Sequence, residues 1–157
     1  MNGHTWALLG VGLLALAGCT GQTVHQDRKT ADPIINMLHS GILDLEGNVD
    51  ELNRRIVEFQ QMPPAEDPTA QELRALDLSG WQLHQQQWLV QRERLALAVK
   101  QIQRAQAHPS EKPELWAQWT TRQPQFAMVL EDLRAQRHAL ERKRLEVESR
   151  LLERYFK

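Results

Sequence analysis

The chain has 157 residues, of which 41% are hydrophobic and 25% are charged, and its 19 Lys and Arg nearly balance its 20 Asp and Glu. A net charge of −1 leaves no excess of basic side chains to neutralise a nucleic-acid backbone, so nucleic acid is not an expected partner. The single cysteine, Cys19, excludes an intrachain disulfide and every metal site built from several cysteines. Because Leu, Gln, Arg, Glu and Ala fill most of the chain, the composition favours long helices and an all-α fold.

An apolar segment lies close to the N-terminus. Residues 5–18 form a stretch of 14 residues that is too short for a transmembrane helix, which needs about 20 residues. The stretch is typical of the apolar core of a signal peptide, predicted here over residues 1–18. Leu16-Ala17-Gly18-Cys19, at its end, resembles the lipobox of bacterial lipoproteins. The resemblance covers residues 1–20 and implies that Cys19 carries a covalent lipid and becomes the mature N-terminus; no other cofactor is expected.

The same resemblance implies a location. In lipoproteins of this kind an Asp after the lipidated cysteine is the usual signal for retention in the inner membrane, and this chain has Thr20 instead. The resemblance therefore implies a lipid-anchored protein on the periplasmic face of the outer membrane. Residues 19–31 are polar and aperiodic, which predicts a flexible tether between the lipid and a folded domain over residues 32–157.

Asp32 and Pro33 have the residue types of a helix N-cap and a first helical position, which predicts a first helix over residues 33–61. Its apolar residues recur at alternating spacings of three and four, as in a coiled coil. Two interpretations fit this seam: a parallel homodimer, or packing on the later helices of the same chain, because antiparallel bundles use the same geometry. The seam residues are Ile35, Leu38, Ile42, Leu45, Val49, Leu52, Ile56 and Phe59.

Three prolines within residues 62–68 are expected to end the first helix. Thr69 and Glu72 then have the spacing of a capping box, which predicts a second helix over residues 70–107. This helix carries two sevenfold apolar series, offset by five residues and so about 140° apart around the helix. Two apolar faces indicate two neighbouring helices. One series is Leu76, Leu83, Val90 and Leu97, and the other is Trp81, Trp88, Leu95 and Ile102.

A second break at residues 108–113 precedes a short predicted helix over residues 113–122 and a long one over residues 124–156. Pro124 either kinks one helix or separates two. The expected architecture is an elongated antiparallel helical bundle or coiled coil, with three main helices and the short one.

Charge is unevenly distributed along these helices. Residues 32–67 hold eight acidic side chains against two basic ones, whereas residues 134–157 hold eight basic side chains against four acidic ones. Opposite charges favour the first and last helices as neighbours. The alternative is that the basic end meets an acidic partner outside the chain.

Four tryptophans are the most distinctive side chains that follow the predicted tether. Trp is enriched at binding hot spots, so these residues are candidate anchors for a protein partner. The alternative is a core role, in which the two pairs form one aromatic rung between antiparallel helices. The four are Trp81, Trp88, Trp116 and Trp119.

The sequence contains no pattern typical of catalysis or metal binding, since its six His are scattered and no phosphate-binding loop or nucleophile motif occurs. We therefore expect no enzymatic activity. The leading hypothesis is a structural or adaptor lipoprotein that docks on, or helps to assemble, an envelope protein complex. The alternatives are a regulatory lipoprotein acting on an envelope sensor kinase, and a carrier of lipids or other hydrophobic ligands.

Overall fold

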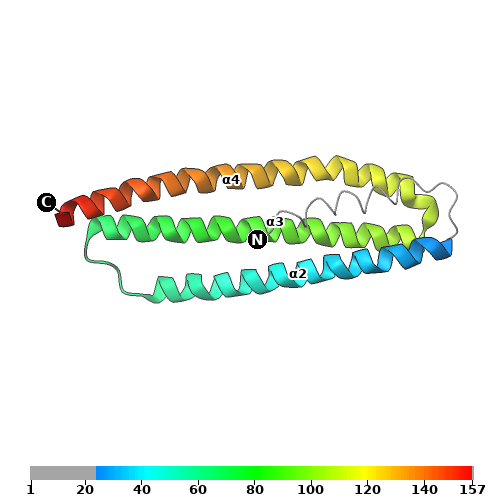
Figure 1. The fold of residues 1–157 in the computed structure, drawn as a ribbon, viewed down its shortest axis with the longest axis horizontal. Coiled ribbons are helices and arrows are strands. Elements are labelled where there is room, and N and C mark those ends of the chain that lie inside the picture. Colours follow the sequence, from blue (N-terminus) through cyan, green and yellow to red (C-terminus); the bar gives the residue numbers. More distant parts are fainter. Residues whose placement is uncertain (1–23, 157) are drawn as a thin grey trace. The chain divides into compact units, whose positions relative to one another are not determined.

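The chain is helical through almost all of the part that the structure describes, residues 24–156 (Figure 1). Over this range the computed structural model contains three long α-helices and no β-strand. The predicted all-α helical bundle is therefore confirmed. The predicted signal peptide and Cys19 lie outside the described residues. The helices are α2 (Val24–Gln61), α3 (Pro68–Ala107) and α4 (Lys112–Phe156), with a short 3-10 helix, η1 (Pro109–Glu111), between α3 and α4.

The start of α2 differs from the prediction. The helix begins at Val24, so residues 24–31 of the expected flexible tether are helical. Pro33 lies inside the helix and is not its first residue, and the N-cap assignment of Asp32 is wrong. A proline here removes only the hydrogen bond to the carbonyl four residues before it. The preceding residues include good helix formers, such as Gln26 and Ala31, which favour continuation of the helix toward the N-terminus.

Asp67 caps the N-terminus of α3 in place of Thr69. Its carboxylate accepts hydrogen bonds from the backbone N–H groups of Thr69 (2.7 Å) and Ala70 (3.0 Å), and Pro68 is the first helical residue. The N–H of Ala70 is the main cause that holds the pKa of Asp67 below its ordinary value. The predicted capping box is wrong because Thr69 is buried and Glu72 pairs with basic side chains of α4.

α4 is one continuous helix of 45 residues with Pro124 inside it. The short helix expected over residues 113–122 is the first part of α4, so the two predicted helices are one. The lost hydrogen bond at Pro124 is a single interruption in a long helix. His108 and η1 form the turn from α3 to α4.

The helices are divided between two compact units. Among the described residues, unit 1 comprises residues 24–43 and 93–125, and unit 2 comprises residues 44–92 and 126–156. Each unit contains parts of α2, α3 and α4 and has its own buried apolar residues. In unit 1 these are Ile35, Leu38, Leu95, Ala98, Val99, Ile102, Ala105, Leu115 and Trp119; in unit 2 they are Val49, Leu52, Ile56, Leu76, Leu130, Leu133 and Val147.

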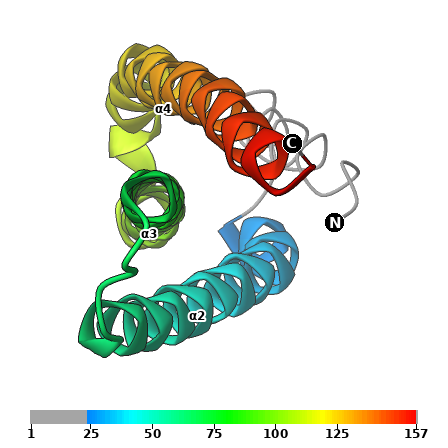
Figure 2. The same ribbon diagram turned by 90° about the vertical axis from the view of Figure 1, so that its left-hand side faces the viewer.

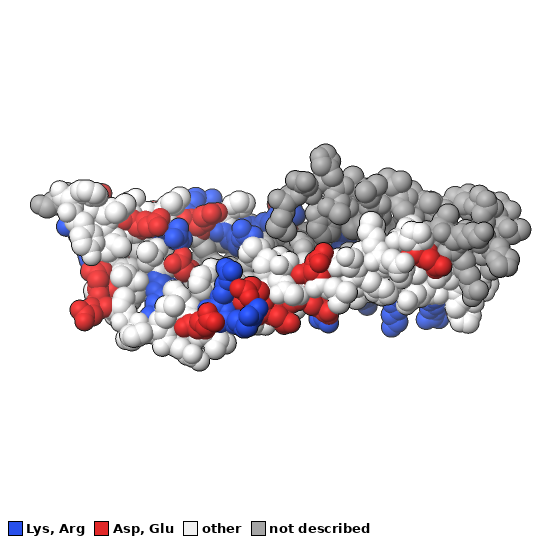
Figure 3. Space-filling view, turned by 60° about the horizontal axis from the view of Figure 1, so that its bottom comes forward, with Lys and Arg blue, Asp and Glu red and all other residues white. Residues whose placement is uncertain are grey.

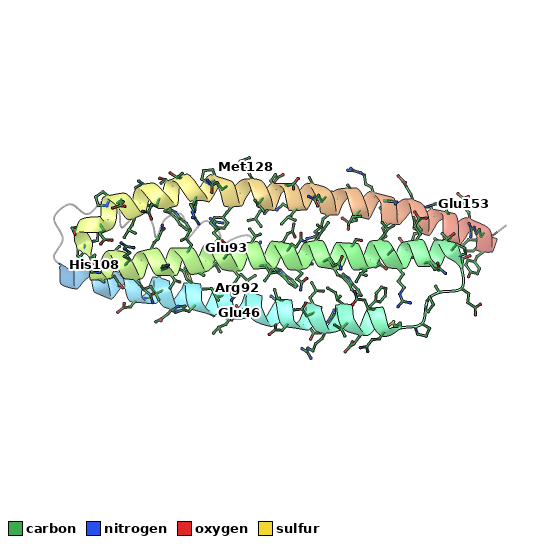
Figure 4. The ribbon with its side chains drawn as sticks, turned by 180° about the vertical axis from the view of Figure 1, so that it is seen from behind. Glu46, Arg92, Glu93, His108, Met128 and Glu153 are labelled. Carbon is green, nitrogen blue, oxygen red and sulfur yellow. The ribbon has the colours of Figure 1, made fainter. Side chains whose placement is uncertain are left out.

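In unit 2, α3 has α2 on one side and α4 on another (Figure 2). Arg92 of α3 donates a hydrogen bond to Glu46 of α2 (2.8 Å), and Gln85 of α3 donates to Asn53 of α2. Seven residues forward along α2 therefore correspond to seven residues back along α3, which is the register of an antiparallel coiled coil. Figure 4 shows Glu46 and Arg92 between the two helices. The prediction that the second helix has two neighbours holds within this unit.

In unit 1, α2 and α3 approach each other closely at Gly41. A Cβ atom at this position would lie 3.2 Å from Cδ1 of Leu95, closer than ordinary van der Waals contact. A glycine inside a helix costs about 1 kcal/mol relative to alanine. At Gly41 that cost is offset by the close packing of Leu95, one of the buried residues of this unit.

Candidate functional site

The predicted seam of the first helix is covered within a single chain. Five of its eight residues are buried, and Ile42, Leu45 and Phe59 are partly buried. The burial supports the interpretation in which the seam packs on later helices of the same chain. The buried members are Ile35, Leu38, Val49, Leu52 and Ile56.

The four tryptophans fall into two places. Trp81 and Trp88 belong to unit 2, and Trp116 and Trp119 belong to unit 1. The ring of Trp81 lies edge-on to Phe59 of α2, with 4.8 Å between ring centroids. Trp81 therefore packs on the seam of α2, which is a core role for this tryptophan. Trp119 is buried, whereas the other three are partly buried.

Arg74 of α3 holds the C-terminal end of α2. Its guanidinium donates hydrogen bonds to the backbone carbonyls of Phe59, Met62 (2.7 Å) and Pro63. It also lies over the ring of Phe59, 4.9 Å from the centroid. The last carbonyls of a helix have no partners within the helix, and a cation there is favoured by the helix dipole. Arg74 thus fixes the end of α2 to the first turns of α3.

Several basic side chains of α4 in unit 2 pair with acids of α3 and its cap. Opposite charges between the first and last helices were expected to make those helices neighbours, but the acids that α4 meets belong to the first turns of α3 and to its cap. Of these acids only Asp67 lies in the acidic segment, residues 32–67. These bases are therefore engaged within the chain. The pairs are Arg144–Asp77 (2.6 Å), Arg150–Glu72 (2.9 Å) and Arg154–Asp67 (3.2 Å).

The opposite side of α4 exposes large apolar side chains. Leu145, Leu152 and Phe156 are 56%, 54% and 86% exposed. At about 100° per residue, they lie 140–180° around the helix from Val147, which is fully buried. Met128, also exposed, and Glu153 lie on the side of α4 that faces away from α3 (Figure 4). We call Leu145, Leu152 and Phe156 the outer stripe. The sequence prediction did not include it as a site, although the spacing of its three residues is visible in the sequence.

The described surface carries both signs of charge. On the face drawn in Figure 3, basic and acidic side chains are interspersed. Among residues 24–156, no group of three or more His, Cys, Asp or Glu side chains is arranged to hold a metal ion. None of the helices in that range has both the length and the apolar character needed to span a membrane.

In comparisons with known proteins, no family model, curated protein or solved structure matches this chain.

One histidine of unit 2 lies in an aromatic and cationic environment. The ring of His84 is 4.2 Å from that of Trp88, centroid to centroid. Arg137 of α4 donates a hydrogen bond to the buried Gln87 (2.9 Å). Partial burial, followed by the charge of Arg137, lowers the pKa of His84. The folded protein therefore favours the neutral form of this imidazole.

We expect His84 to make unit 2 less stable in mild acid. The pKa of His84 in the folded chain lies below the value of about 6.5 for an unfolded chain. Its contribution to stability is therefore complete above that pH and is lost as the pH falls below it toward the folded-state pKa. In urea titrations at pH 7.5 and pH 5, His84→Phe should lose less stability on acidification than the wild type. An equal loss in both proteins would show that His84 does not titrate in this way.

Proposed function

We propose that the chain is a lipid-anchored adaptor on the periplasmic face of the outer membrane, which docks on, or helps to assemble, an envelope protein complex. The observation that carries the proposal is the sequence Leu16-Ala17-Gly18-Cys19, which resembles a lipobox and precedes a helical bundle. A lipidated cysteine holds the protein at a membrane surface, since each buried CH₂ of an acyl chain contributes about 0.8 kcal/mol.

The surface of the bundle supports a role in protein association. Large apolar side chains that are left exposed in a group are a feature of protein–protein contact sites. In unit 2 such side chains gather on one side of α4, where Leu145, Leu152 and Phe156 are all more than half exposed. An adaptor needs a rigid element to present such a surface, and a helix packed along α3 provides one.

The proposal is tested in cells with the full-length chain and its Cys19→Ser variant, both carrying a C-terminal affinity tag. The wild type should incorporate labelled palmitate and fractionate with the outer membrane, and chemical crosslinking should join it to one envelope protein well above background. Cys19→Ser should lose the label and leave the membrane fraction.

Two results would contradict the proposal. Equal labelling and fractionation of the two proteins would show that Cys19 does not carry the lipid anchor. Normal anchoring with no envelope protein captured above background would leave a lipoprotein but would reject the adaptor role.

A further inference from the structure

The outer stripe of α4 is a short apolar seam that the described residues of unit 2 leave exposed. Leu145, Leu152 and Phe156 are separated by seven and four residues, so they lie along one side of the helix. With a rise of 1.5 Å per residue, the stripe is about 17 Å long, the length of about three helical turns. Ser149 lies within it and is small enough for a close approach of another helix. The geometry matches one half of a coiled-coil interface.

Acidic side chains line both edges of this stripe. Glu141 and Glu148 lie about 100–120° from Val147 around the helix, on one edge, and Glu146 and Glu153 lie about 240–260° from it, on the other. In a coiled coil these edge positions select the partner through charge. The cations of this part of α4, among them Arg144 and Arg150, are turned to α3 and paired there. One cation, Arg142, is exposed about 220° from Val147, one turn before Leu145 and on the same edge as Glu146 and Glu153.

This charge pattern discriminates between occupants. A second copy of the chain would place most glutamates opposite glutamates in either orientation, because each edge of the stripe carries two glutamates and Arg142 is the one exposed cation among them. An anionic lipid surface would be repelled for the same reason. A helix with an apolar seam flanked by Lys and Arg meets both requirements, since its apolar side chains cover the stripe and its cations face the glutamates.

We infer that the outer stripe of α4 binds an amphipathic helix of another protein whose apolar seam is flanked by basic side chains. The inference rests on the proposed adaptor function and specifies the surface and the class of partner. The stripe supplies the contact area, and the glutamates at its edges select the partner.

The test uses two synthetic helical peptides of three heptads each, with the same Leu seam and with either Lys or Glu at all flanking positions. Like charges keep each peptide monomeric. Binding of the labelled peptides to the full-length chain in zwitterionic nanodiscs is measured by fluorescence anisotropy over a salt series. The Lys peptide should bind at least about tenfold tighter than the Glu peptide, and its affinity should fall as salt screens the charges.

Two exposed leucines give a matched pair of variants. Leu152→Glu should weaken binding of the Lys peptide by about tenfold. Leu43→Glu, at a residue of α2 that is 67% exposed, should leave the affinity unchanged. Both substitutions are at exposed positions, so both proteins should keep the helical circular dichroism of the wild type. The double variant Glu141→Lys/Glu146→Lys should reduce or reverse the preference for the Lys peptide. Glu148 stays unchanged because it also pairs with Arg144 (3.3 Å).

Two outcomes would overturn the inference. One is equal affinity of the chain for the two peptides, and the other is an unchanged affinity for the Lys peptide in Leu152→Glu. If the chain self-associates and Leu152→Glu abolishes the self-association, the stripe binds a second copy instead. If the chain binds anionic vesicles and Leu152→Glu abolishes that binding, the stripe binds a membrane instead. The adaptor function is judged separately. If Leu152→Glu still captures the same envelope protein in cells, the function stands and the stripe is not its docking surface.

Discussion

Replacing Ile102 with alanine is expected to lower the free energy of unfolding by about 2–5 kcal/mol. Ile102 is only 2% exposed and lies in the core of unit 1. Two of its neighbours along the same side of α3 are Ala98 and Ala105, both buried. Alanine side chains cannot extend into the vacated volume, so a cavity should remain. An ordinary domain is stable by roughly 5–15 kcal/mol. A loss of this size is therefore a large part of the total stability.

The measurement is urea unfolding followed by circular dichroism and tryptophan fluorescence. Leu43→Ala, at an exposed position of the same unit, is the matched control and should change the free energy of unfolding by less than about 0.5 kcal/mol. Similar losses for the two variants would show that Ile102 is not in a closely packed core.

Replacing Arg74 with methionine should destabilise the protein by about 2 kcal/mol. The change keeps a long apolar side chain but removes the donors to the carbonyls of Phe59, Met62 and Pro63. It also removes the cation over the ring of Phe59, an interaction of about 0.5–1 kcal/mol at exposed sites. Because these bonds join the end of α2 to α3, their loss should loosen the turn over residues 62–67.

Arg74→Lys separates geometry from charge. A lysine keeps the positive charge near the end of α2, but its single ammonium cannot span three carbonyls as a planar guanidinium does. We expect Arg74→Lys to recover less than half of the stability lost in Arg74→Met, measured by urea unfolding. Full recovery would mean that charge alone, through the helix dipole, accounts for the role of Arg74. Faster hydrogen exchange at the end of α2 in both variants would place the effect at that turn.

The periodic parts of the chain were predictable because buried apolar side chains must repeat with the helix. The seam from Ile35 to Phe59 and the two apolar faces of α3 follow from this requirement, and the structure buries or partly buries the residues of that seam. The interruption at Pro63 and Pro64 was also correctly placed between α2 and α3, and Pro68 is the first residue of α3. A cluster of prolines removes several hydrogen bonds within one turn.

The single prolines were harder to interpret from the sequence. Pro33 and Pro124 each lie inside a helix, although each was considered as a helix start or boundary. One proline costs one backbone bond and some steric strain, which the remaining turns of a long helix can outweigh. The capping residue of α3 was missed because two adjacent segments have the residue types of a helix cap. Asp67-Pro68 and Thr69 through Glu72 both have capping patterns; the backbone N–H groups of Thr69 and Ala70 donate to Asp67, and Glu72 pairs with α4 instead.

The charge of a segment did not determine which helix it contacts. A count over residues 134–157 gives an excess of bases, but it does not say on which side of the helix each base lies. Arg144 and Arg150 lie toward α3, whereas Glu141 and Glu146 flank the apolar stripe on the other side. A helical wheel that includes Leu145, Leu152, Phe156 and the buried Val147 separates the apolar stripe from the face that packs on α3. The stripe could therefore have been predicted from the sequence.

Site-specific photocrosslinking in cells tests most directly whether this bundle docks on an envelope protein through the outer stripe of α4. A photoreactive amino acid replaces Leu152 in one version of the full-length chain and Leu43 in another, two positions of similar exposure. We expect one abundant crosslink from position 152, to an envelope protein whose contacting helix has basic flanks, and none from position 43. A crosslink of equal strength from both positions, or from neither, would contradict it.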